Sequence, residues 1–361
     1  MGAMAGLALL MGSSCSTGAK WPLSDHFDGS RFHNPTGPEM PGLWGAIKFA
    51  GAYFRSAPWP ESVENHPDLH LNPAPGQDQA AITFVNHATV LIQLPNLTIL
   101  TDPIWSERAG PVNWFAAKRV RRPGIPFEQL PKIDLVLVSH NHYDHLDLDT
   151  LKRLNATFAP RFLVPLGNKA LLESEGIGRV EELDWWDQVT LGPDSRVILT
   201  PAQHFSSRGL FDQNKSLWGS YLIQHDGRSV YFAGDTGYSS HFAEIRRRFG
   251  AVDLAFLPIG ANEPRAFMTL AHMNPADAVQ AHVDLGAQYS VPIHFGTFHL
   301  GIEPIDQPLT DLNAARAARG LSQEQFEALG EGRTHVFTFS RPRQVPSQAA
   351  ARIAEPPILT H

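Results

Sequence analysis

Four side chains that can bind metal occur within six residues, in the segment His140–His145. In an extended chain residues i and i+2 face the same side, so His140 and His142 can bind one ion together. Asp144 and His145 come where the chain turns toward the next helix, so they can point at a second ion close by. This pattern predicts a site for two metal ions.

Three residues further along the chain can complete these ligand sets. His204, Asp235 and His294 each follow an apolar run that predicts a strand, and strand ends converge at one edge of a sheet. Gly234 and Gly237 flank one of them and let the backbone approach its neighbours closely. The predicted metal ligands are therefore His140, His142, Asp144, His145, His204, Asp235 and His294.

The composition restricts the metal chemistry. The chain has 361 residues, 17 histidines and one cysteine, Cys15, so it cannot contain an internal disulfide or a zinc finger built on two or four cysteines. A metal site must therefore use His, Asp and Glu, a set that suits zinc and would also tolerate iron or manganese. The net charge of −7 argues against a nucleic-acid partner, because phosphate contacts need a basic surface.

Strands must position these residues. Alternating residues at 81–85, 89–94 and 97–100 predict a meander, and the continuous apolar run Ile133–Ser139 predicts a strand buried on both faces. Further strands are expected at 161–165, 180–183, 196–200, 218–224, 229–233, 254–258, 289–294 and 335–339, and helices at 241–249 and 309–318. Meanders that give way to alternating strands and helices, twice over, predict an α/β domain of α+β type, with two mixed sheets packed face to face and helices outside.

Two further helices carry cap signals. Asp147 can cap a short helix that presents Leu151 and Leu154 on one side. Asn274 is expected to cap, Pro275 to start and Gly286 to end a longer helix.

The ligand pattern as a whole resembles the metallo-β-lactamase superfamily, which has a four-layer αββα sandwich. The resemblance implies that one ion takes His140, His142, His204 and a bridging Asp235, and that the other takes Asp144, His145, Asp235 and His294. Classical zinc β-lactamases commonly have a cysteine in place of Asp235, so antibiotic hydrolysis is not expected. A bridging aspartate instead resembles the hydrolases of phosphodiesters and thioesters.

A closer resemblance, over about residues 86–340, is to the family of phospholipases D that hydrolyse N-acylphosphatidylethanolamine, here to a bacterial member. The most specific segments are Asp184–Trp186 and Trp218–Ser220. The other matching segments are 87–90, 101–104, 118–122, 139–147, 214–217, 233–238, 258–265 and 293–298. The resemblance implies release of N-acylethanolamine and phosphatidic acid from a phospholipid. Asn262 and His299 depart from the family's pattern near the substrate, as does the N-terminal region.

The resemblance also implies roles in catalysis. Two ions about 3.5–4 Å apart can share a hydroxide that attacks phosphorus at neutral pH. Asp144 would orient this water and help to take its proton, besides binding metal. His272 matches a family histidine near the substrate and is the candidate acid, unless it is only a solvent-facing neighbour of the helix cap. His87 and Asp102 are candidates either for positioning the metal ligands or for purely structural roles.

The two ends of the chain suggest where the protein acts. Residues 1–19, apolar and then small before Cys15, resemble a bacterial lipoprotein leader, which predicts an envelope protein on a membrane surface. No basic residue precedes Lys20, so a cytoplasmic protein with an uncleaved start stays open. Residues 20–80 are an N-terminal extension, 81–342 the catalytic domain and 343–361 a loosely attached tail.

Several alternatives stay open at this point. The segment 42–55 could be an amphipathic helix that packs on the domain or that contacts a membrane. A basic cluster at Lys118, Arg119, Arg121 and Arg122 could be a solvated face or a site for an anionic headgroup. The enzyme could instead hydrolyse an ester, thioester or lactone, as glyoxalase II does, or the chain could be a membrane-anchored lipoprotein without activity. A homodimer is possible.

Overall fold

The computed structural model of the protein describes residues 20–35, 51–53, 55–56, 58–65, 75–111, 116–209 and 211–342. The predicted leader with Cys15, most of the predicted helix at 42–55 and the predicted tail at 343–361 lie outside these residues.

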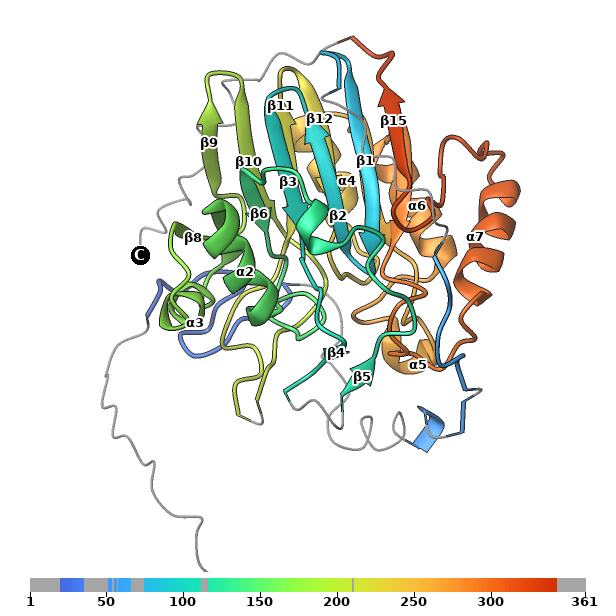
Figure 1. Ribbon diagram of the computed structural model, residues 1–361, viewed down its shortest axis with the longest axis horizontal. Coiled ribbons are helices and arrows are strands. Elements are labelled where there is room, and N and C mark those ends of the chain that lie inside the picture. Colours follow the sequence, from blue (N-terminus) through green and yellow to red (C-terminus); the bar gives the residue numbers. More distant parts are fainter. Residues whose placement is uncertain are drawn as a thin grey trace, which may run out of the picture.

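Two mixed β-sheets pack face to face at the centre of the molecule (Figure 1). The first sheet has the order β15 (Thr334–Thr338), β1 (Gln79–Asn86), β2 (Thr89–Leu94), β3 (Leu97–Thr101), β6 (Leu135–Leu137), β7 (Arg161–Pro165) and β8 (Val180–Leu183). The second has the order β14 (Tyr289–Ile293), β13 (Leu254–Pro258), β12 (Arg228–Phe232), β11 (Ser220–His225), β10 (Ser195–Thr200) and β9 (Gln188–Gly192). A small ribbon of β4 (Arg108–Ala109) and β5 (Ala117–Lys118) lies apart from both.

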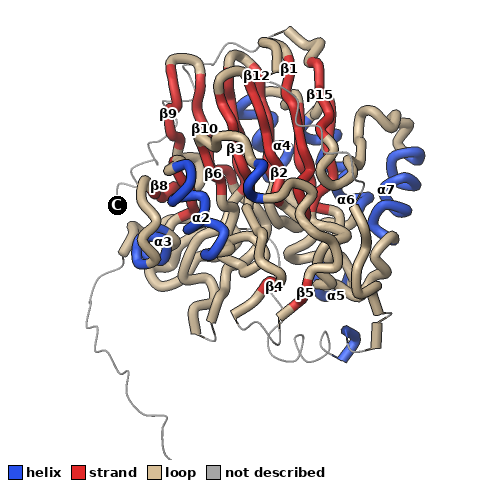
Figure 2. The backbone as a smooth tube through the Cα atoms, viewed as in Figure 1, coloured by secondary structure: helices blue, strands red, loops and turns tan. Residues whose placement is uncertain are grey.

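Helices cover the outer face of each sheet, which confirms the predicted αββα sandwich (Figure 2). On the first sheet, Leu151 and Leu154 of α2 (Leu148–Phe158) belong to the same buried cluster as Val136, and the short α3 (Lys169–Ser174) lies beside β8. On the second sheet, Phe242 and Ile245 of α4 (His241–Phe249) are buried in the main hydrophobic core. The other helices with both ends in the described ranges are η1 (Phe127–Gln129), α5 (Arg265–Met268), α6 (Pro275–Leu285) and α7 (Gln307–Ala318), and residues 51–53 are also helical. Within the described ranges, no helix has the length and apolar character needed to cross a membrane.

The predicted meander, strands and longer helices are confirmed, with ends that differ by up to a few residues. The largest difference is β6, which keeps only Leu135–Leu137 of the predicted seven residues, although the flanking side chains of Ile133 and Ser139 are also buried. Strand β9 was not predicted because it is a short edge strand whose apolar face consists of only Val189 and Leu191, too few residues for a clear strand signal. The short α3 and α5 also gave no periodic signal.

The two helix caps have different outcomes. Asn274 accepts a hydrogen bond from the amide of Asp277, whose carboxylate accepts one from the amide of Asn274, and Gly286 ends α6 in the left-handed region, as predicted. Asp147 precedes α2, but the prediction of a side-chain cap was wrong. Its carboxylate instead accepts hydrogen bonds from the loop residues Trp105 and Ser106, whose amides have no strand partner to bind.

The start of the described chain, residues 20–35, folds back onto the sandwich, and we call it the N-terminal clasp. Phe27 and Phe32 are buried in the core between the sheets. His26 lies between two carboxylates, with its Nδ1 2.6 Å from Asp25 and its Nε2 2.8 Å from Asp184. Burial opposes a positive charge on His26, but hydrogen bonds to the two carboxylates outweigh it and raise the pKa of this imidazole above its ordinary value.

The His26 contacts should make clasp stability depend on pH. A group whose pKa is higher in the folded than in the unfolded state stabilises the fold most at pH values below its unfolded pKa. This contribution is lost as the pH rises through its folded pKa. We therefore expect the stability difference between wild type and His26→Asn to be larger at about pH 6 than at about pH 9. Urea unfolding at the two pH values measures this difference. The control is His33→Asn, because His33 is an exposed residue of the same clasp. An equal difference at both pH values would contradict this account of His26.

Candidate metal centre

The fold brings all seven predicted ligands to one edge of the sandwich. The loop after β6 carries the cluster from His140 to His145, while His204, Asp235 and His294 follow β10, β12 and β14. The first sheet therefore supplies four of the ligands and the second sheet three. That these residues bind metal stays a prediction, and their geometry can be compared with what metal ions require.

Three histidines form the first group. His140 Nε2 lies 2.8 Å from His142 Nδ1, and His204 Nε2 lies 3.3 Å from that same atom. Nitrogen atoms that bind one zinc ion at about 2.0–2.1 Å lie roughly 3–3.5 Å apart. The three rings can therefore bind a single ion.

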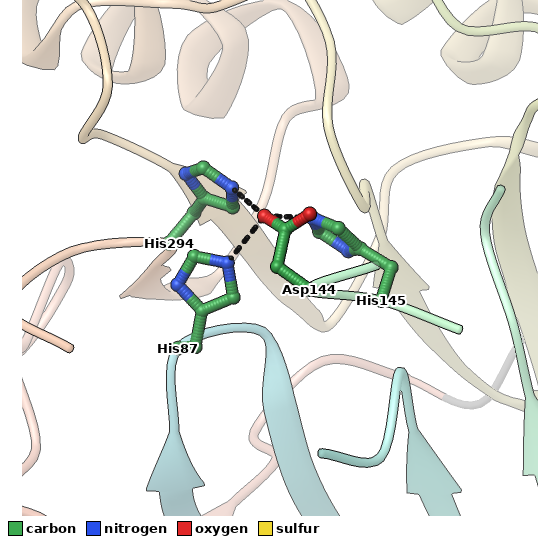
Figure 3. Close-up of side chains that lie close together, drawn as sticks. All are labelled: His87, Asp144, His145 and His294. Carbon is green, nitrogen blue, oxygen red and sulfur yellow. Dashed lines mark hydrogen bonds and ion pairs between the residues drawn. The ribbon is translucent and has the colours of Figure 1, made fainter. Parts of the chain in front are cut away.

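The second group contains Asp144, His145 and His294, which point toward one another (Figure 3). Asp144 Oδ2 lies 3.3 Å from His145 Nε2 and 3.4 Å from His294 Nε2. Asp235 Oδ2 lies 3.2 Å from His145 Nε2 and 3.1 Å from His294 Nε2, and it is also 3.9 Å from His204 Nε2 in the first group. Asp235 thus stands between the two groups, where the resemblance placed a bridging carboxylate.

The ring nitrogens that face away from the centre have fixed partners. His145 Nδ1 lies 2.6 Å from the carboxylate of Asp102, and His204 Nδ1 lies 3.0 Å from the carbonyl oxygen of Ala271. His140 Nδ1 lies 2.9 Å from Ser139 Oγ. Such partners set the tautomer and orientation of a metal-binding imidazole. Asp102 therefore has the positioning contact that was one of its two predicted roles.

His87, at the turn between β1 and β2, also belongs to this centre (Figure 3). Its Nε2 lies 2.9 Å from Asp144 Oδ2, and its ring packs at 4.0 Å from that of His294. The backbone of His87 accepts a hydrogen bond from the amide of His294, so the two turns hold each other. The sequence predicted His87 as a candidate positioning residue. Its contact is with Asp144, the candidate catalytic carboxylate.

The charges within this buried site are strongly coupled. Burial favours protonation of Asp144 and Asp235, but the nearby imidazoles outweigh it and hold the pKa of each carboxyl well below its ordinary value. Burial opposes the charge on His294, yet Asp235 and Asp144 raise its pKa to about 9. For His140 and His204 burial prevails and lowers the pKa well below its usual range, so these rings are neutral and can act as metal ligands.

The donor set fits divalent metal ions. His145 Nε2 and Asp235 Oδ1 are buried without any hydrogen-bond partner, which is costly for polar atoms unless something else binds them. Imidazole nitrogens and carboxylate oxygens are ligands for zinc, iron and manganese. The protein thus buries a group of donor atoms whose polar requirements a metal pair would satisfy.

Unusual backbone conformations occur where these side chains meet. His87, Asp102 and His294 have positive φ angles of 48°, 33° and 60°, which non-glycine residues rarely adopt. Gly234 has φ 58°, and a Cβ atom there would lie 2.4 Å from the Cβ of Ser139. The predicted close approach beside Asp235 is therefore real, since only glycine lets β12 end against the loop after β6.

A cavity of about 200 Å³ opens onto the centre. Its polar part is formed by His142, Asp144, Asp235, His272 and His294. Its other part is apolar and is formed by Phe205, Ala261, Phe267, Met268, Ala271 and Leu300. None of these apolar residues was singled out from the sequence, because nothing local distinguishes them from core residues.

His272 lines this cavity and does not face bulk solvent. Its Nδ1 lies 3.8 Å from Asp235 Oδ2 and has no hydrogen-bond partner. Burial, above all, lowers the pKa of His272 to about 4. Arg265, to which the sequence assigned no role, donates to the carbonyl oxygen of His272 and pairs at 2.7 Å with Asp277 of the α6 cap.

The predicted basic cluster is not a single surface. Arg119 is buried, donates to the carbonyl oxygens of Ile104 and Ser106, and packs on the ring of Phe298. Arg121 pairs with the buried Glu331. Both predictions for the cluster were wrong for these two arginines, since each serves the fold. Lys118 and Arg122 are exposed.

The sequence profile of the β-lactamase superfamily domain matches residues 98–295, more than half of the chain. The chain belongs to the metallo-β-lactamase superfamily. It is 41% identical over 249 residues to N-acyl-phosphatidylethanolamine-hydrolyzing phospholipase D 1 of Caenorhabditis elegans, a match that covers 65% of this chain and 70% of the relative. It is 39% identical over 223 residues to the mitochondrial protein of that name from Saccharomyces cerevisiae, covering 59% and 46% of the two chains.

A solved structure of a metallo hydrolase has a similar fold. The metallo hydrolase of the archaeon Ignicoccus hospitalis superposes with a TM-score of 0.55 at 22% identity, over 73% of this chain and all of the other. The predicted resemblance is thereby confirmed, and the protein is a metal-dependent hydrolase that uses divalent ions.

The Asp102 contact predicts the effect of a single substitution. We expect Asp102→Asn to lower metal affinity roughly 10- to 100-fold, because His145 loses the carboxylate that orients it. Competition with a coloured chelator measures this affinity. Asp253→Asn is a matched control, since Asp253 is equally buried and accepts from the amide of Ser229, far along the second sheet. Equal metal loss in both variants would show that the effect is not specific to His145.

Proposed function

We propose that the protein is a dinuclear phosphodiesterase of phospholipase D type. It would hydrolyse N-acylphosphatidylethanolamine to N-acylethanolamine and phosphatidic acid. The observation that carries this proposal is the cavity, in which a carboxylate–imidazole centre meets an apolar wall. The identity of 41% to a relative that bears the name of such an enzyme supports the same substrate class.

The shape of the cavity suits one end of a lipid. At about 200 Å³ it is smaller than the pockets of roughly 300–1,000 Å³ that enclose drug-sized ligands, so a whole phospholipid would not fit inside. A phosphate group can lie against the polar part, and the first methylene groups of the bound lipid can lie against Phe205, Met268 and Leu300. The remaining chains would stay outside, as expected for an enzyme that works on a lipid surface.

The residues of the site divide the work of hydrolysis between them. When bound, the ions would neutralise charge on the phosphate and lower the pKa of water. Asp144 accepts the proton of the attacking water at its carboxylate, while His87 holds that carboxylate in place. The bond between phosphorus and the ethanolamine oxygen breaks, and this oxygen takes up the proton that Asp144 accepted from the water. His272 stands at the cavity wall, where an N–H group can bind the leaving oxygen.

The wider setting belongs to the same proposal. We propose zinc as the native metal in both positions, because the ligands are mostly imidazoles. A lipid substrate implies action at a membrane surface, and lipidation of Cys15 in a bacterial envelope would keep the enzyme there. If residues 1–19 are not a signal, the protein would act from the cytoplasm.

The reaction is tested with purified zinc-loaded protein and N-acylphosphatidylethanolamine in mixed micelles. We expect N-acylethanolamine to be released, and EDTA to abolish its release. Asp144→Asn should lower kcat by roughly 10²–10⁴-fold, as for a lost general base, and His272→Ala by roughly 10²–10³-fold, as for a lost hydrogen-bond donor to the leaving oxygen. Asp149→Asn, on the exposed face of α2, is the control for Asp144 and should keep full activity.

Two outcomes would overturn the proposal. Much faster hydrolysis of a phosphorus-free ester, thioester or lactone would favour an enzyme like glyoxalase II. Binding of two zinc ions per chain without turnover of any phosphodiester would favour a lipoprotein without activity.

The apolar wall predicts a specific effect on substrate binding. We expect Met268→Gln to raise KM for a long-chain substrate roughly tenfold, since the loss of about 1.4 kcal/mol of apolar contact is a tenfold change. A short soluble phosphodiester should keep its KM. Steady-state kinetics with both substrates measures this, and Leu23→Gln, at an exposed apolar residue, is the control. A similar rise for both substrates would place Met268 outside the chain-binding wall.

A further inference from the structure

The side chain of Asn34, in the N-terminal clasp, binds the backbone of His204. Its Nδ2 donates to the carbonyl oxygen of His204 at 2.8 Å, and its Oδ1 accepts from the amide of His204 at 3.2 Å. One planar amide thus satisfies both peptide groups of a predicted metal ligand. In a sheet, a neighbouring strand would make these two bonds.

A third contact fixes which way the Asn34 amide is turned. The indole Nε1 of Trp218 is shared between the carbonyl oxygen of Ala202, at 3.0 Å, and Asn34 Oδ1, at 3.2 Å. Because an indole N–H and the amide N–H of His204 can only donate, both favour the Asn34 oxygen on their side, which leaves the nitrogen facing the carbonyl of His204. Trp218 is itself almost fully buried, so this orientation is held by the core.

His204 needs such support because it lies beyond the end of its strand. Strand β10 ends at Thr200, four residues earlier. The ring of His204 is held at Nδ1 by the carbonyl of Ala271, and its backbone is held by Asn34. With both ends fixed, Nε2 is directed toward His142.

The clasp also holds the segment that follows His204. The amide of Phe32 donates to the carbonyl of Asn214, and Asn214 in turn exchanges hydrogen bonds with Ser206. Phe32 is buried, and His26 ties the clasp to Asp184. The burial of Phe32 and the ion pair of His26 therefore hold the clasp, and Asn34 with it, in place.

We propose that Asn34 is a positioning residue of the metal centre. It keeps the peptide of His204 in the place from which the ring reaches the first metal position. The N-terminal clasp lies outside residues 98–295, the part matched by the superfamily profile, so a segment outside that domain completes the centre. This inference rests on the proposed binding of metal by His204.

The test measures zinc release from the full-length zinc-loaded protein to a coloured chelator. We expect Asn34→Ala to release one of its two ions about 10- to 100-fold faster than wild type, the size of effect that orienting contacts have on metal sites. Asn34→Asp keeps an acceptor for the His204 amide, so its rate of zinc release should lie between those of wild type and Asn34→Ala. His33→Ala changes the exposed neighbour in the clasp and should behave as wild type.

Two further measurements separate positioning from general stability and from the metal assignment. The Tm of metal-free protein reports on folding alone, and unchanged zinc release with a lowered Tm in Asn34→Ala would overturn the proposal. Loss of one cobalt absorption band in the cobalt-loaded variant, with the other band kept, would support it. His204→Ala must itself lose one ion. If it keeps both ions, the assignment of His204 fails, whereas normal release in Asn34→Ala alone refutes only the positioning role.

Discussion

The metal centre depends on the hydrogen bonds that the buried carboxylate of Asp102 accepts. It accepts hydrogen bonds from the amide and the hydroxyl of Ser139 and lies 2.6 Å from His145 Nδ1. A charge with no exposed surface is tolerated only when donors surround it, and these three groups provide them. The same contacts join the end of β3 to the loop after β6, and so they place the whole segment from His140 to His145 at the edge of the first sheet.

The second constraint is that the centre is divided between the two sheets. Asp235 comes from the second sheet, yet its carboxylate lies 3.2 Å from His145 of the first. Neither sheet alone holds a complete set of ligands, so closure of the sandwich and assembly of the centre are one event. The glycine at 234 allows this approach, because any larger residue would collide with Ser139. Burial of so many donor atoms is costly in itself, and bound metal offsets this cost.

Around this centre, three further contacts each hold one residue in place. His87 holds the carboxylate of Asp144, Arg265 holds the backbone of His272, and Asn34 holds that of His204. The apolar wall, to which Phe205 and Leu300 belong, lies directly beside this centre, and the substrate proposed above places hydrocarbon against it. The hydrolytic chemistry is thus a property of the superfamily.

The sequence by itself determined the fold class and predicted the candidate ligand set. The spacing of His140, His142, Asp144 and His145, and the apolar runs before His204, Asp235 and His294, are local patterns, and local periodicity decides which side chains share a face. Strand β9 escaped prediction for the same reason, since its alternation covers only Val189 and Leu191. Only the tertiary structure decided which partners meet. It placed Asp102 behind His145, bound the carboxylate of Asp147 to the loop at Ser106, and buried Arg119, which the sequence had grouped with exposed basic residues. It also brought Asn34 against His204, 170 residues away. Such pairings depend on how distant segments pack, and no short stretch of sequence contains that information.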